Sequence, residues 1–133
     1  MADADGRTSL MHAILAGDSG AVASLIDRGA DVNAVDHEQR WTALHFAARD
    51  HNRTVVRLLL DAGAEVDPED VFGDTPLWRA VMTAGGDLTA MSVLLGHGAD
   101  PRRRNRHGIS PLDLARESGQ DAVVALLLHP ASE

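Results

Sequence analysis

One phrase recurs four times along the chain, and this repetition constrains the fold more than any other feature. The phrase is TSLMHAIL from Thr8, WTALHFAA around Thr42, TPLWRAVM from Thr75 and SPLDLARE from Ser110. Its Thr or Ser positions are separated by 34, 33 and 35 residues. Self-similarity at such a period is typical of arrays in which one supersecondary unit is stacked on the next.

Each unit has the residues of two short helices separated by a turn. Thr or Ser stands where a helix N-cap belongs, and Pro76 and Pro111 follow it at the first helical position. Leu and Ala positions then align across the units, and a second helix carries a pair of large apolar residues before it ends at Gly. The Leu–Ala pairs are Leu10 and Ala13, Leu44 and Ala47, Leu77 and Ala80, and Leu112 and Ala115; the terminating glycines are Gly29, Gly63 and Gly98.

Helices this short do not hold together alone. Isolated helices under about 12–15 residues are marginal in water, so each unit must bury its apolar face against a neighbour. The sequence therefore predicts an all-α repeat, an α-solenoid of four stacked helix–turn–helix units joined by β-turn or hairpin loops. We expect one domain over residues 1–133, with repeats at approximately 3–35, 36–68, 69–103 and 104–133.

The chain resembles the ankyrin repeat family in WTALHFAA, in VVRLLLDAGAEVD and in GADVN. The resemblance runs from about residue 3 to residue 128. Two departures matter. The family's His is kept only at His45, so the hydrogen bonds that brace the turns are expected to weaken where Met11, Trp78 and Asp113 replace it. His51 stands where the inter-helix Gly belongs, which costs on the order of 1 kcal/mol if this residue is left-handed.

Composition restricts the function classes. The chain has no Cys, and its net charge of −8 argues against nucleic acid as a partner. There is neither a signal peptide nor an apolar run that could span a membrane, so we expect a soluble, cytoplasmic protein that is a monomer when unbound. All 12 cationic residues are Arg, a bias that suggests a GC-rich, bacterial coding sequence.

The sequence predicts neither an enzyme nor a metal or cofactor site. The seven His residues form no HExxH motif, and no Cys is available to complete a zinc set. No nucleophile motif surrounds any Ser, and Gly85-Gly86 lacks the residues of a phosphate-binding loop. The acidic stretch VDPEDVFGDT is read as a solvated hairpin because its Gly and Glu are misplaced for a calcium loop.

The run PRRRNRH contains four arginines, at 102, 103, 104 and 106, and has two interpretations. It is a solvated stretch that balances acidic neighbours, or it is a clamp for an acidic patch on a partner, since Arg binds carboxylates in bidentate fashion. Charge is uneven along the chain: residues 1–100 hold 16 Asp and Glu against 7 Arg, and residues 101–133 hold 4 against 5.

The ankyrin resemblance implies a partner-binding face made of the hairpins and the first helices, on the concave side. The predicted partner-binding residues are Arg7, Leu15, Trp41, Arg49, Asp50, Phe72, Asp74, Met82, Thr83, Arg106, His107 and Ile109. Trp41 and Phe72 fall where the core of the repeat does not require them, and an apolar centre with charged edges is typical of a protein interface.

We therefore expect a non-catalytic protein–protein interaction module with no cofactor. Its net charge and size are compatible with a small inhibitor, an immunity protein or an antitoxin that acts on a basic toxin. An adaptor or scaffold subunit of a larger assembly fits equally well, and a metal-dependent or enzymatic protein is the opposing class.

Overall fold

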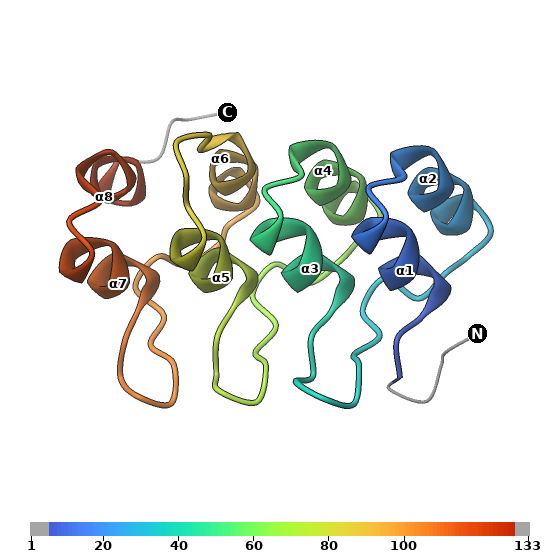
Figure 1. The fold of residues 1–133 in the computed structure, drawn as a ribbon, viewed down its shortest axis with the longest axis horizontal. Coiled ribbons are helices and arrows are strands. Elements are labelled where there is room, and N and C mark those ends of the chain that lie inside the picture. The colour runs from blue at the N-terminus through green and yellow to red at the C-terminus, as the bar shows by residue number, and fades with distance from the viewer. Residues whose placement is uncertain (1–5, 130–133) are drawn as a thin grey trace.

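The computed structural model describes residues 6–129, which form eight helices in four pairs. The first helices of the pairs are α1 (Ser9–Leu15), α3 (Ala43–Arg49), α5 (Pro76–Met82) and α7 (Pro111–Glu117). The second helices are α2 (Ser19–Asp27), α4 (Arg53–Asp61), α6 (Thr89–Gly96) and α8 (Asp121–Leu128). Figure 1 shows the pairs side by side in one row, with the first helices in one layer, the second helices in another and the hairpins projecting from the first layer. The predicted all-α repeat solenoid is confirmed.

The helices begin where the recurring phrase predicts. Thr8, Thr42, Thr75 and Ser110 are the N-caps of the first helices, and each side chain accepts a hydrogen bond from the backbone amide three residues later. Such a cap contributes about 1 kcal/mol. Within residues 6–129 there is no β-strand, and the second hairpin holds an isolated bridge between Val35 and Thr42. No described helix is long and apolar enough to cross a membrane.

The core lies between the two helix layers and is built from the aligned Leu and Ala positions. Leu44 and Leu77 have no exposed surface, and neither do Ala47 and Ala80, which follow each of them by three residues. Small residues at these positions let adjacent first helices approach closely. Burial on both sides makes the central pairs the best-packed part of the row.

The turns show where the backbone departs from the repeat. His51 has φ +55°, so the inter-helix position is left-handed as predicted, whereas Gly17 and Gly119 take it at lower cost in other repeats. Arg40 has φ +59° at the hairpin position that Gly73 and its equivalents occupy in the other repeats. The loop from α5 to α6 spans residues 83–88 and is longer than the other inter-helix turns.

Hydrogen bonds between successive hairpins fix their register. The amide of Val71 donates to the carbonyl of Gln39 at 2.9 Å, and the amide of Arg106 donates to the carbonyl of Phe72 at 2.9 Å. Because the bonds join one loop to the next, the loop residues are held in a defined order along the row. This order positions the candidate site.

Candidate functional site

The candidate site is the face formed by the hairpins and the first helices, which we call the inner face. The large apolar side chains that are exposed in the described chain are Leu15, Phe72 and Met82, at 39%, 46% and 58%. Leu15 and Met82 end α1 and α5, and Phe72 lies in the hairpin before α5. All three were predicted to bind a partner. Exposed apolar side chains gathered on one face are typical of an interaction surface.

Arginines cover the aromatic rings of this face. The guanidinium carbon of Arg49 lies 5.3 Å from the ring centroid of Trp41 and 5.5 Å from that of Phe46, and Arg7 lies 5.6 Å from Phe46. Arg79 lies over Trp41 at 5.1 Å and over Phe72 at 5.8 Å. Stacking holds each guanidinium in place, so the inner face is ordered before a partner arrives.

Trp41 corrects one sequence-based expectation, because the core does require it. Its side chain is only 5% exposed and packs with the buried core. Its indole nitrogen donates to Asp70 Oδ2 at 2.9 Å, and its ring lies edge-on to Phe46. The indole therefore joins the second hairpin to the third, and it offers a partner little surface of its own.

Asp70 is the centre of a buried polar network that the sequence did not reveal. Its Oδ2 also accepts from Arg79 Nε at 3.2 Å and from Nη2 at 3.0 Å, and Arg79 Nη2 lies 3.0 Å from Asp74 Oδ2. Burying carboxylates is unfavourable unless they are paired and hydrogen-bonded, and Arg79 provides that pairing. The sequence analysis did not select Arg79 because its partners lie upstream, in the loop before α5. The acidic residues Asp70 and Asp74 in that loop were the available signal.

Asp74 is also buried, at 3% exposed, although it was predicted to contact a partner. Burial raises the pKa of Asp74, and a hydrogen bond at 2.7 Å from the side-chain amide of Asn105 opposes that rise. Asp74 therefore fixes the third hairpin to the fourth. Its described contacts are with Asn105 and Arg79.

The remaining predicted residues occupy the ends of the first helices and the fourth hairpin. Thr83 donates to the carbonyl of Arg49 at 2.8 Å, which brings the ends of α3 and α5 together, and Arg49 Nε pairs with Asp50 at 3.0 Å. In the fourth hairpin Arg106 and His107 are exposed and Ile109 is half-buried. The fourth-hairpin residues thus lie next to Phe72 and away from Leu15, which is at the other end of the row.

His45 has the bracing role that the sequence indicated. It is fully buried, its Nδ1 contacts the Thr42 amide at 3.1 Å, and its Nε2 lies 2.9 Å from the carbonyl oxygen of Asp74. Burial lowers its pKa from 6.5 to about 4. At Trp78 the expected weakening holds only in part: its indole nitrogen donates to the carbonyl of Ile109 at 3.2 Å, which is the equivalent link to the next hairpin, but an indole has no acceptor that could replace the Nδ1 bond to the N-cap amide.

A small hollow of about 50 Å³ opens on the inner face beside Trp41 and Phe46. Arg7, Arg49 and the carboxylates of Asp36 and Glu38 contribute to its lining, so its charges are balanced. No three potential metal-ligating side chains are grouped within residues 6–129. The hollow has room for part of one side chain, which is too little to enclose a small-molecule ligand at this place.

Two models of the ankyrin repeat family match most of the chain. The family model "Ankyrin repeats (3 copies)" matches residues 1–70, and the model "Ankyrin repeat" matches residues 72–106. Serine/threonine-protein kinase 12 of Arabidopsis thaliana is 40% identical over 115 residues, which cover 85% of this chain and 23% of the kinase. A putative ankyrin repeat-containing protein of Treponema pallidum is 37% identical over 114 residues, covering 86% of this chain and 38% of that protein.

A third relative is closer in length. The putative ankyrin repeat protein YahD of Escherichia coli is 27% identical over 163 residues, covering 95% of this chain and 81% of that protein. The first two relatives are much longer, and this chain spans 23% and 38% of their lengths. The similarity to the kinase therefore concerns a part of that protein.

Proposed function

The chain belongs to the ankyrin repeat family, and from that premise we propose that it is a non-catalytic module that binds a partner protein on its inner face. One observation carries the proposal: the exposed large apolar side chains of the described residues, Leu15, Phe72 and Met82, all belong to this face. Leaving them exposed is unfavourable in an isolated chain, and a partner that covers them recovers about 25 cal/mol for each Å² removed from water.

The side chains of the inner face are already held in place in the unbound chain, and this supports the proposal that the face binds a partner. Rings and guanidinium groups are stacked, and buried bonds from Trp41 and His45 join one hairpin to the next. A partner therefore meets side chains whose conformational entropy has already been lost during folding. Phe72 and Met82 are the apolar anchors at the centre, and Arg49 and Asp50 form a charged edge.

Such a module has two biological uses, as an inhibitor that sequesters its partner or as an adaptor that holds it in an assembly. Inhibitor here includes an immunity protein or antitoxin. Both uses need the same surface. The activity of the purified partner, measured with and without a saturating amount of this chain, distinguishes them: a loss of activity identifies an inhibitor, and unchanged activity identifies an adaptor.

The test begins with a photo-crosslinking amino acid placed at Phe72, and in a control chain at Leu126 on α8. We expect position 72 to capture a partner that position 126 does not. Binding to that purified partner is then measured by calorimetry for the Phe72→Ala/Met82→Ala variant and for Leu126→Ala. Loss of these anchors should weaken binding about 100-fold, near 2.7 kcal/mol. Unchanged affinity in the double variant refutes the inner face as the binding surface.

A further inference from the structure

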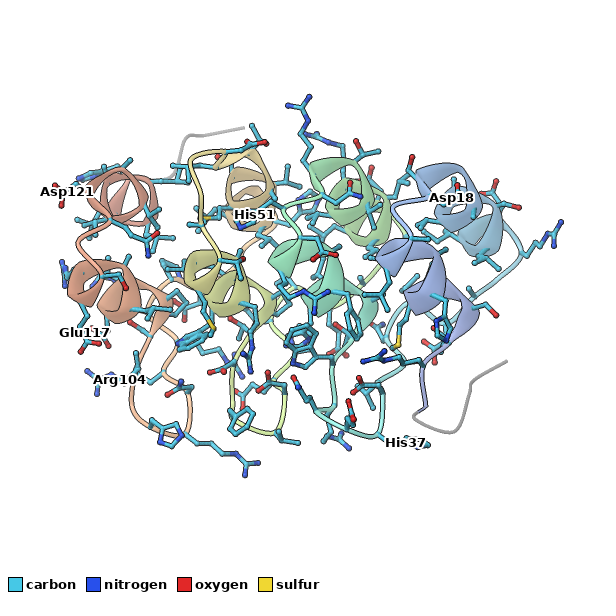
Figure 2. All side chains as sticks on the ribbon, in the orientation of Figure 1. Asp18, His37, His51, Arg104, Glu117 and Asp121 are labelled. Carbon is cyan, nitrogen blue, oxygen red and sulfur yellow. The ribbon has the colours of Figure 1, made fainter. Side chains whose placement is uncertain are left out.

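The fourth hairpin, residues 101–109, carries the largest unpaired positive charge of the described chain. Arg102, Arg104 and Arg106 are exposed, and none forms an ion pair with a carboxylate of residues 6–129. Arg103 differs, because its Nη2 lies 2.7 Å from Glu69 Oε2 and its Nε donates to the same oxygen at 2.9 Å. Figure 2 shows Arg104 on the outer side of its hairpin, directed away from the stack. A close ion pair with an acidic neighbour thus accounts for one arginine of the four, and Arg104 acts on Asp113 only at longer range, where its charge contributes to lowering the Asp113 pKa.

The third and fourth hairpins carry opposite charge at equivalent positions. When the repeats are aligned on Gly63 and Gly98, Arg102 occupies the position of Asp67 and Arg104 that of Glu69. The basic hairpin therefore follows repeats that are acidic: residues 1–100 hold 16 Asp and Glu against 7 Arg. The acidic earlier repeats repel a negatively charged partner, and the fourth hairpin, where three unpaired arginines stand close together in the sequence, attracts it.

An exposed apolar side chain adjoins the arginines. The amide of Arg106 donates to the carbonyl of Phe72 at 2.9 Å, so the exposed Phe72 ring and Arg106 come from adjacent, hydrogen-bonded loops. The contact is close, since a Cβ added at Gly73 would lie 2.9 Å from the Arg106 nitrogen. Phe72 supplies an apolar contact beside Arg106 at one side of the basic hairpin, which is the combination of anchor and charged edge found in protein interfaces.

We propose that the fourth hairpin and Phe72 bind an acidic segment of the partner protein. Carboxylates of that segment pair with Arg102, Arg104 and Arg106, and an apolar side chain among them covers Phe72. Guanidinium forks bind carboxylates in bidentate fashion, and exposed Arg is more weakly hydrated than Lys, which reduces the desolvation cost. The inference rests on the proposed function and adds the chemistry and the orientation of the partner.

A protein segment fits this surface better than a nucleic acid. Nucleic-acid binding relies on many phosphate contacts along an extended basic face, whereas residues 1–100 hold 16 carboxylates of Asp and Glu against 7 Arg. Phosphates that continued past three arginines would meet those carboxylates. A short acidic segment ends before it reaches them.

The probes are poly-L-glutamate and a random glutamate–tyrosine copolymer, with binding measured by calorimetry and mapped by amide chemical shifts of the labelled chain. The test variant is Arg102→Ala/Arg104→Ala/Arg106→Ala, which leaves the Arg103 ion pair intact. The control is Arg28→Ala/Arg53→Ala/Arg57→Ala, which removes three exposed arginines that also lack ion pairs and so changes the net charge equally. We expect about a tenfold loss of affinity in the test variant and less than about threefold in the control.

A separate comparison of the two polymers tests the apolar contact at Phe72. The copolymer should bind about tenfold more tightly than poly-L-glutamate, and Phe72→Ala should remove that difference. Equal losses in the two triple variants, shifts that avoid residues 101–109, or tighter binding of a DNA duplex than of either polymer would each overturn the proposal. Failure here, while crosslinking at position 72 still captures a partner, removes the acidic-segment inference and leaves the binding module standing.

Discussion

Lowering the pH should destabilise the fold through His45, which has no exposed surface and bonds to Thr42 and Asp74. Burial lowers its pKa from 6.5 to about 4. Because the folded pKa lies below the unfolded one, the unfolded chain binds the extra proton, so stability falls as the pH falls from 6.5 toward 4. Going from pH 7 to pH 5 should cost about 2 kcal/mol, and the full loss below pH 4 approaches about 3 kcal/mol.

The assay is urea denaturation followed by circular dichroism at pH 7 and at pH 5, on the natural chain and on His45→Gln. The variant is less stable but lacks the titrating imidazole, so its free energy of unfolding should change less between the two pH values. Other ionisable groups are common to both chains and cancel in the difference. Equal changes in the two chains, or a His45 ring that titrates near 6.5 by NMR in the folded protein, would refute the reasoning.

Three further substitutions test the backbone and the links between hairpins, each by urea denaturation at pH 7. Arg40→Gly should stabilise the chain by about 1 kcal/mol, because φ is +59° at this position. Trp78→Phe removes the bond to Ile109 and should cost about 1 kcal/mol; a neutral result would mean that this bond does not contribute. Gly73→Ala should cost more than about 1 kcal/mol, because φ is +78° and the added Cβ meets the Arg106 backbone; an unchanged midpoint would contradict the register of the hairpins.

Much of the fold could be predicted because the residues that begin and end each helix are recognisable within the repeat itself. The N-caps at Thr42 and Thr75 and the left-handed glycines at Gly63 and Gly98 act within a few residues, so a single sequence contains all the information they require. The same holds for the inter-helix position of His51. Local rules of this kind apply before any distant contact is known.

The candidate site was less predictable, because the burial of a side chain depends on residues that are distant in the sequence. Alignment placed Trp41 at a hairpin position, but its burial follows from Asp70, which is 29 residues later. Leu15 and Met82 could be recognised as exposed residues because they occupy the same position in their repeat units, at a fixed distance from the buried positions of their helices. Arg79 could not be recognised in the same way, since its importance comes from the ring of Trp41 and the carboxylate of Asp74.

The strained backbone positions fall in the same repeat as the buried bonds of Trp41 and His45, and a physical reason connects them. Within residues 6–129, Arg40 and His51 are the non-glycine residues with positive φ, and both flank α3. Each costs on the order of 1 kcal/mol. Between them lie Trp41 and His45, whose bonds reach the third hairpin. A repeat with buried links of this kind offsets unfavourable backbone angles with the interaction energy that it gains from its neighbours.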